Sequence, residues 1–96
     1  MRVRYTEPAA LDFDASVDYL RKHAPSVVAE FADSVDEAVA LLLQQPYSAE
    51  ATDMPRVRRW YIRRFKHMLF YTIEGDELVI LHIRHAARRW PWEREE

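Results

Sequence analysis

Apolar residues recur with a helical period through the first half of the chain. A first set, ending near His23, follows spacings of three and four residues, and a second set continues the same period to about Gln45. Thr6 is suited to cap the first helix, and Pro25 interrupts the pattern between the two sets. We therefore expect two antiparallel helices joined by a tight turn.

After Pro55 the pattern changes to that of β-strands. Three runs rich in aromatic and β-branched residues span Arg58 to Arg64, Met68 to Glu74 and Glu77 to Arg84. A short turn around Gly75 separates the last two runs, as is typical of a β-hairpin. These runs predict a three-stranded antiparallel meander.

A further short strand is expected before the first helix, from Arg2 to Thr6. The order strand, helix, helix, strand, strand, strand predicts a single α+β domain over residues 1–96. Its helical hairpin would pack on one face of a small, mainly antiparallel sheet. Because side chains alternate along a strand, we expect the last strand to face the helices with Val79, Leu81 and Ile83 and to face away with Ile80, His82 and Arg84.

The composition is that of a folded protein rather than a disordered one, with 49% hydrophobic and 31% charged residues in a chain of 96. Cysteine is absent, which excludes disulfide bonds, thiolate zinc sites and a thiol nucleophile. No apolar run approaches the roughly 20 residues that span a bilayer, and the first residues lack the apolar segment of a signal peptide. We expect a cytoplasmic protein without a membrane partner.

The formal net charge of −2 conceals two halves of opposite sign. Residues 1–54 carry four basic and ten acidic side chains, whereas residues 55–94 carry ten basic and four acidic ones. Twelve of the fourteen basic residues are arginine, whose planar guanidinium suits phosphate and carboxylate groups. Two interpretations remain open: a solvated charged surface with internal ion pairs, or a face that binds phosphates or acidic groups.

Common catalytic patterns are missing. His82 and His85 lie three apart, so on an extended strand they point to opposite faces and are not expected to hold a metal ion. Gly75 alone cannot form a phosphate-binding loop. The serines lack the nucleophile-elbow pattern of many hydrolases: Ser16, Ser26, Ser34 and Ser48. We expect no metal, no cofactor, and neither hydrolase nor NTPase activity.

Arginine and aromatic residues alternate between Arg56 and His67. Such a mixture could stack bases and bind phosphates, but a half-buried strand has the same pattern, with Trp60 and Ile62 inward and Tyr61 outward. We favour the half-buried strand. A second basic cluster follows the last strand, in the run from Arg84 to Arg89.

The order of elements and two runs of sequence resemble the RelE/ParE superfamily of toxins from bacterial type II toxin–antitoxin modules. The runs are His67 to Asp76 and Val79 to Arg89, and the likeness covers nearly the whole chain. In this superfamily, RelE-like members cut messenger RNA on the ribosome, whereas ParE-like members poison DNA gyrase without a nuclease site.

Departures from the nuclease pattern favour the ParE-like branch. Where the ribonucleases typically have Arg-x-x-Tyr, this chain reads Met68 to Tyr71, and methionine cannot stabilise charge on a phosphate. Ala86 replaces a tyrosine found in some ribonucleases, and a net charge of −2 disfavours binding to ribosomal RNA. The resemblance thus implies a non-catalytic protein that binds gyrase and forms a hetero-oligomer with a cognate antitoxin.

The resemblance also suggests which residues meet each partner. Residues expected to bind the target are Arg59, Arg63, Arg64, Arg84, His85, Arg88 and Arg89. Residues expected to bind the antitoxin are Phe13, Val17, Leu20, Phe31, Val35 and Leu42. The alternative is a RelE-like endoribonuclease acting on ribosome-bound mRNA, with Arg63, Arg64, Arg84 and His85 as catalytic groups. A third possibility is an interaction module without toxicity.

Overall fold

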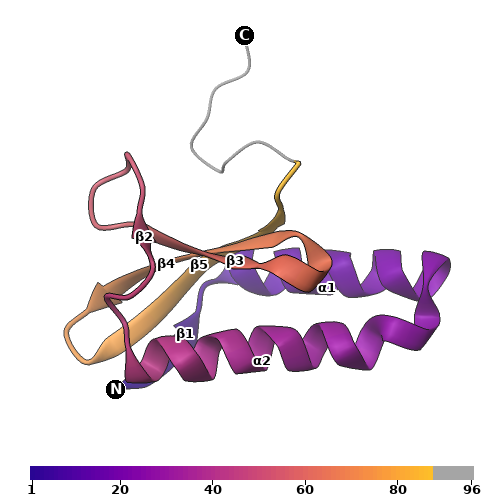
Figure 1. Ribbon diagram of the computed structural model, residues 1–96, viewed down its shortest axis with the longest axis horizontal. Helices are drawn as coiled ribbons and strands as arrows, with labels where there is room; N and C mark the ends of the chain where they lie inside the picture. The colour runs from indigo at the N-terminus through magenta and orange to yellow at the C-terminus, as the bar shows by residue number, and fades with distance from the viewer. Residues whose placement is uncertain (88–96) are drawn as a thin grey trace, which may run out of the picture.

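Two antiparallel helices lie against a five-stranded sheet in the structure, a computed structural model that describes residues 1–87 (Figure 1). The predicted order of elements is confirmed, with one short strand added between the second helix and the meander. Within residues 1–87, none of the helices has the length and apolar character needed to cross a membrane. The elements are β1 (Arg2–Tyr5), α1 (Glu7–His23), η1 (Pro25–Val27), α2 (Val28–Gln44), β2 (Glu50–Ala51), β3 (Arg58–Ile62), η2 (Arg63–Phe65), β4 (His67–Glu74) and β5 (Glu77–His85).

Thr6 caps α1 as the sequence predicts. Its side-chain oxygen accepts a hydrogen bond of 3.2 Å from the amide of Ala9. The same hydroxyl lies 3.1 Å and 3.0 Å from the carbonyl oxygens of Ile80 and Leu81, to which it donates. Thr6 therefore joins the start of α1 to the middle of β5 and fixes where the helix crosses the sheet edge.

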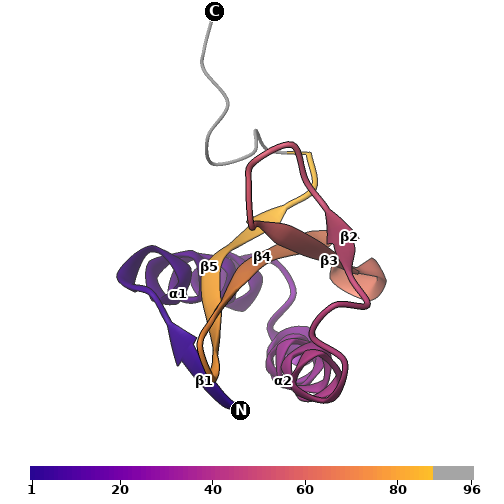
Figure 2. The same cartoon turned by 90° about the vertical axis from the view of Figure 1, so that its left-hand side faces the viewer.

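The sheet has the strand order β1-β5-β4-β3-β2. β1 pairs in parallel with β5, and all other pairings are antiparallel. β1 reaches only as far as Ile80 of β5, so the second half of β5 has no strand on the side away from β4. The helix α1 lies along this open part of the edge (Figure 2).

The expected alternation along β5 is wrong because the strand contains a β-bulge. Phe70 pairs with His82 and Tyr71 pairs with Ile80, which leaves Leu81 as an extra residue. The extra residue shifts the alternation by one position in the second half of the strand. The main core cluster consequently takes Leu78, Ile80 and Ile83 from β5, at 0%, 0% and 1% exposure, whereas Leu81 is only partly buried and Val79, also buried at 2%, lies outside this cluster.

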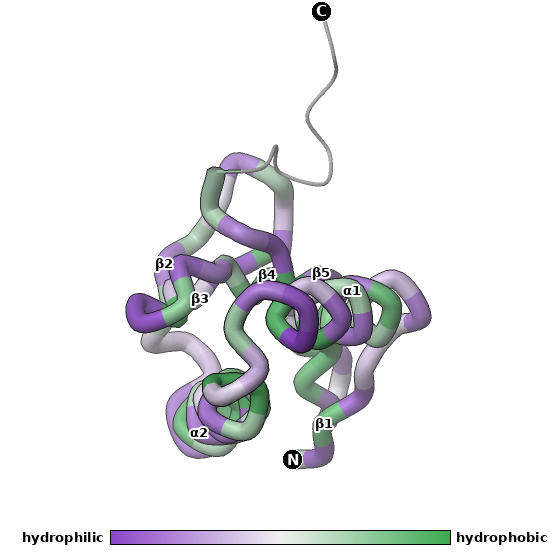
Figure 3. The backbone as a smooth tube through the Cα atoms, turned by 90° about the vertical axis from the view of Figure 1, so that its right-hand side faces the viewer, coloured by the Kyte–Doolittle hydropathy of each residue, from purple (hydrophilic) through white to green (hydrophobic). Residues whose placement is uncertain are grey.

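The core lies between α2 and one face of the sheet. α2 shows alternating apolar and polar positions (Figure 3) and buries Phe31, Val35 and Leu42 completely against the strands. Phe31 is central, because its ring stacks on Phe13 of α1 at 5.6 Å between centroids and meets the edge of Phe65 at 5.3 Å. Burying side chains of this size stabilises the fold by about 1.5–3 kcal/mol each. Both helices therefore contribute to one core.

Candidate functional site

The turn between β3 and β4 and the end of β5 meet at one end of the sheet. β4 runs antiparallel to both neighbours, so its first residue, His67, pairs with Ile62 on one side and His85 on the other. The amide of Ala86 donates a 2.6 Å hydrogen bond to the carbonyl of Lys66. We call the basic residues gathered here the basic end: Arg63, Arg64, Lys66, Arg84 and His85.

Four of the seven residues expected to bind the target lie at the basic end: Arg63, Arg64, Arg84 and His85. Arg59 does not, because it lies further back on β3 and its guanidinium bonds Glu50 on β2 at 3.0 Å. Arg88 and Arg89 lie outside the described residues. Arg63, Arg64, Arg84 and His85 thus lie together and Arg59 lies apart from them, and target binding by these residues stays a prediction.

Exposure differs among the residues of the basic end. Arg63, Lys66 and His85 are exposed. Arg64 forms an ion pair with Glu30 of α2, yet 63% of its side chain remains exposed. Arg84 has only 26% of its side chain exposed. A large partner could reach all of these groups except most of Arg84.

Asp12 of α1 holds the second half of β5 in place. One of its carboxylate oxygens accepts a 3.1 Å hydrogen bond from the amide of Ile83, on the side of β5 that β1 does not reach. The same oxygen lies 2.9 Å from Nδ1 of His82 and 3.8 Å from Nε of Arg84. Arg84 Nε is buried and has no hydrogen-bond partner of its own in the structure. Asp12 therefore sets the positions of two β5 side chains at once.

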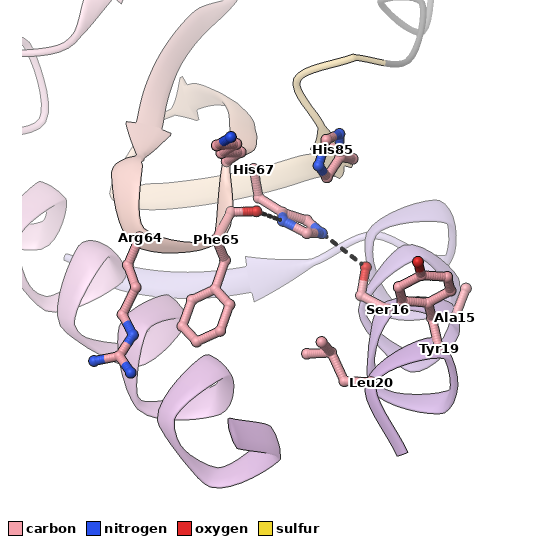
Figure 4. Close-up of a pocket in the computed structure, with 9 residues that line it drawn as sticks. Ala15, Ser16, Tyr19, Leu20, Arg64, Phe65, His67 and His85 are labelled. Atoms are coloured by element: carbon pink, nitrogen blue, oxygen red, sulfur yellow. Dashed lines mark hydrogen bonds between the residues drawn. The ribbon is translucent and has the colours of Figure 1, made fainter. Parts of the chain in front are cut away.

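A surface cleft of about 620 Å³ lies beside the basic end, between α1 and η2 (Figure 4). Its lining residues are Ala15, Ser16, Tyr19, Leu20, Arg64, Phe65, Lys66, His67 and His85. Lys66, at its rim, has a φ of 52°, the left-handed conformation that turns the chain from η2 into β4. The cleft combines apolar walls with cationic side chains, and none of its lining residues in the described chain is acidic.

His67 is the buried polar group of this cleft, at 8% exposure. Its Nδ1 lies 2.6 Å from the carbonyl oxygen of Phe65 and its Nε2 lies 3.0 Å from Oγ of Ser16 (Figure 4). Burial lowers the pKa of His67 below its ordinary value of 6.5, and the nearby His85 lowers it further, against an opposing effect of the Phe65 carbonyl. Burial therefore favours the neutral form of the ring.

Sequence reasoning missed Asp12, Ser16 and His67. Asp12 and Ser16 each directly precede a residue of the apolar stripe of α1, at a spacing of four. That spacing places both side chains on one face at the border of the buried stripe, where a polar group needs a partner. This position beside the buried stripe is the signal in the sequence that could have identified Asp12 and Ser16.

The residues expected to bind the antitoxin divide into two groups. Phe31, Val35 and Leu42 are buried in the core at 0%, 1% and 0% exposure, so the expectation that they contact a partner is wrong. Their helical spacing reflects packing on the sheet. Phe13, Val17 and Leu20 of α1 are partly buried against the same core: they retain some accessible surface.

The set of catalytic residues in the ribonuclease alternative is divided between the two faces of the sheet. Neighbouring residues of a strand point to opposite faces, so Arg84 and His85 diverge. His85 turns toward the cleft, with its ring centroid 5.4 Å from that of His67. Arg84 pairs across the ladder with Met68 on the other face. The position that holds arginine in the nuclease pattern thus presents a thioether beside Arg84.

Comparisons with solved structures identify the fold. The search of curated proteins gave no match. A solved structure described as the chromosomal ParDE toxin–antitoxin system from P. aeruginosa has a TM-score of 0.78 at 24% identity, covering 88% of this chain and 95% of that one. The isolated E. coli RelE toxin has a TM-score of 0.62 at 15% identity, covering 92% of this chain and 86% of that one. Both similarities show the shared fold.

The match to a family model is more specific than the similarity to solved structures. The model of the family described as the ParE toxin of the type II toxin–antitoxin system, parDE, matches residues 3–90, which is most of the chain and includes both helices, the sheet and the basic end. The resemblance seen in the sequence is confirmed, on the ParE side of the superfamily. The chain belongs to the ParE family of toxins from type II toxin–antitoxin systems.

Proposed function

We propose that this toxin inhibits DNA gyrase by binding it through the basic end, without breaking a phosphodiester bond. The observation that carries the proposal is the pairing of Met68 with Arg84 on the face of the sheet opposite the core. A nuclease needs positioned charges around the scissile phosphate. Met68 supplies no charge there, and Arg84 lies near the carboxylate of Asp12.

The separation of Arg84 from His85 supports the same conclusion. A ribonuclease that used both would need them on one phosphate, within hydrogen-bond distance of the reacting atoms. Here His85 belongs to the cleft beside His67, and Arg84 belongs to the opposite face. The exposed cations Arg63 and Lys66 lie on the turn, where they suit attraction of an acidic protein surface better than chemistry.

Membership of this family implies an antitoxin partner. For its docking surface we propose the exposed side of α1, where Leu11 and Tyr19 are 60% and 62% exposed. Leu11, Ala15 and Tyr19 follow one another at a spacing of four, so they share one exposed face of α1 and offer an apolar surface for an amphipathic segment of the antitoxin. Tyr19 also lines the cleft, so a bound antitoxin segment would lie next to the basic end and compete with the target there. Gyrase acts on DNA inside the cell, which places the proposed action in the cytoplasm.

A supercoiling assay with purified gyrase tests the proposal. The wild-type protein should inhibit supercoiling, and added antitoxin should restore it. The double variant Arg63→Glu, Lys66→Glu should inhibit at least about tenfold more weakly, which corresponds to about 1.4 kcal/mol of lost binding.

Arg2→Glu is the matched control. Arg2 is exposed and lies opposite Glu77 in the ladder between β1 and β5. His85 of the basic end lies at the other end of β5. This variant should inhibit as the wild type does. Full gyrase activity at saturating wild-type toxin would reject the proposal, and equal inhibition by the double variant would reject the role of the basic end.

A further inference from the structure

Ser16 and His67 form a pair that inhibition of gyrase does not require. The two residues are 51 positions apart in the chain and meet inside the cleft, on α1 and at the start of β4. Figure 4 shows the hydroxyl of Ser16 directed at the imidazole, with His85 above both. Neither side chain faces the Met68 and Arg84 side of the sheet.

The direction of each hydrogen bond follows from the chemistry of the partners. The carbonyl oxygen of Phe65 can only accept, so Nδ1 of His67 carries the proton in the 2.6 Å contact. In the neutral ring Nε2 then has a lone pair, and the hydroxyl of Ser16 donates to it at 3.0 Å. This is the arrangement of a hydroxyl nucleophile with its general base, in which the base is oriented by a third group.

The cleft also provides a group that can stabilise developing negative charge. The amide of Ala87 donates to Nδ1 of His85 at 3.1 Å, so in the neutral ring of His85 the proton is on Nε2. The His85 ring lies 5.4 Å from that of His67, and Lys66 lines the same cleft. An N–H donor and an ammonium group near a reacting carbonyl favour an oxyanion.

The other residues that line the cleft determine which kind of ligand fits it. Ala15, Leu20 and Phe65 are apolar, and the cleft opens to solvent between α1 and η2. A small acyl group fits such walls. Lys66 and Arg64 at the rim favour a leaving group that carries or develops negative charge.

We propose that Ser16 is a nucleophile that accepts the acyl group of small esters, with His67 as its general base. Oγ of Ser16 forms a bond to the acyl carbon, and the hydroxyl proton moves to Nε2 of His67. The bond between the acyl carbon and the leaving oxygen then breaks, and the leaving oxygen takes that proton. Water gives a proton to the same nitrogen and attacks the acyl carbon, the bond between that carbon and Oγ breaks, and Oγ of Ser16 takes the proton back from Nε2, which releases the acid and restores both residues.

The test uses the full-length protein with 4-nitrophenyl acetate and with a fluorophosphonate probe. Release of 4-nitrophenol followed by peptide mass analysis locates any acetyl group, and the fluorophosphonate gives a stable adduct on an activated serine. We expect the adduct on Ser16, and at least about a hundredfold slower acylation in Ser16→Ala and in His67→Gln, the range that general-base assistance provides.

Ser34→Ala is the matched control. Ser34 is a helical serine on α2 whose hydroxyl donates to the carbonyl of Glu30, with no histidine beside it. It should acylate at the wild-type rate. Peptide mapping of the wild-type adduct decides the question even where a variant fails to fold. Absence of an adduct on Ser16, or an adduct on Lys66 or the amino terminus alone, would overturn the proposal without affecting the gyrase assay.

Discussion

Met68 of β4 lies directly opposite Arg84 of β5 on the face of the sheet that points away from the core. Adjacent side chains of such a pair are close enough to interact strongly. In the nuclease branch of the superfamily this methionine position is an arginine. Two guanidinium groups would then stand side by side, which makes sense for a site built to hold a phosphate. The thioether of Met68 carries no charge, so this face lacks the second guanidinium that would hold a phosphate.

Replacing Met68 with arginine should therefore destabilise the unliganded protein. Like charges directly opposite each other cost about 0.2–1 kcal/mol, and Asp12 can offset only part of the added positive charge. Urea denaturation of Met68→Arg and Met68→Leu measures the effect. The leucine variant, similar in volume, should unfold close to the wild-type midpoint. An arginine variant more stable than the leucine variant would contradict the expected repulsion between Arg84 and an arginine at position 68.

Removing the carboxylate of Asp12 should weaken the attachment of α1 to β5. Asp12→Ala leaves the amide of Ile83 and Nδ1 of His82 without their acceptor, at an expected cost of about 1–3 kcal/mol in the free energy of unfolding. Asp12→Asn keeps one acceptor oxygen and should lose less.

Asp14→Ala is the control for the Asp12 variants, because Asp14 is exposed on the same helix. Its free energy of unfolding should stay within about 0.5 kcal/mol of the wild type. Equal stability of the Asp12→Ala and Asp14→Ala variants would show that the contacts of Asp12 do not stabilise the fold.

Stability should also depend on pH through His67. Its pKa is below 6.5 in the folded protein and near 6.5 in the unfolded chain, so the unfolded chain binds more protons as the pH falls. The contribution of His67 to the free energy of unfolding is therefore complete above pH 6.5, and it is lost as the pH falls through the pKa of the folded state. Groups facing the ring include Ser16 and Tyr19 of α1, Arg64 and Lys66 of the turn, and His85 of β5.

Unfolding curves of the wild type and of His67→Gln between pH 7.5 and pH 5 measure this dependence. The glutamine variant should lose less stability on acidification than the wild type. His23→Gln, at an exposed histidine of α1, serves as the control and should follow the wild type. If all three proteins lost stability in parallel, the low pKa of His67 would be excluded as the cause.

The antitoxin surface on α1 predicts a specific effect of Tyr19. Tyrosine at the centre of an interface commonly contributes about 2 kcal/mol or more to binding. Tyr19→Ser should therefore raise the antitoxin concentration needed to neutralise the toxin. Tyr47→Ser, at a residue that is 68% exposed after α2, should be neutralised as the wild type is. The reverse order of the two variants would place the antitoxin elsewhere.

Much of the fold could be predicted because its signals are local. Thr6, Pro25 and Gly75 mark the start of α1, the turn between the helices and the hairpin, and each lies where expected. The bulge at Leu81 could not be predicted in this way. It depends on the register between β4 and β5, a property of two strands that alternation within one strand does not encode.

The same difference between local and long-range signals applies to the candidate site. The cations of the basic end are close in sequence to a turn or a strand end, so their clustering followed from the expected topology. Asp12 with Ile83 and Ser16 with His67 are contacts between α1 and the sheet, at separations of 71 and 51 residues. Phe31, Val35 and Leu42 were assigned to a partner because a helical apolar stripe looks the same whether it packs on a sheet or on another protein.

The most direct test of the central claim compares two assays on one preparation of purified toxin. In the first, gyrase supercoils plasmid DNA in the presence of increasing toxin. In the second, ribosomes translate a defined message, and primer extension maps its integrity. We predict that supercoiling is lost while the message stays intact. Codon-positioned cuts that disappear in Arg84→Ala or His85→Ala, with gyrase fully active, would contradict the account.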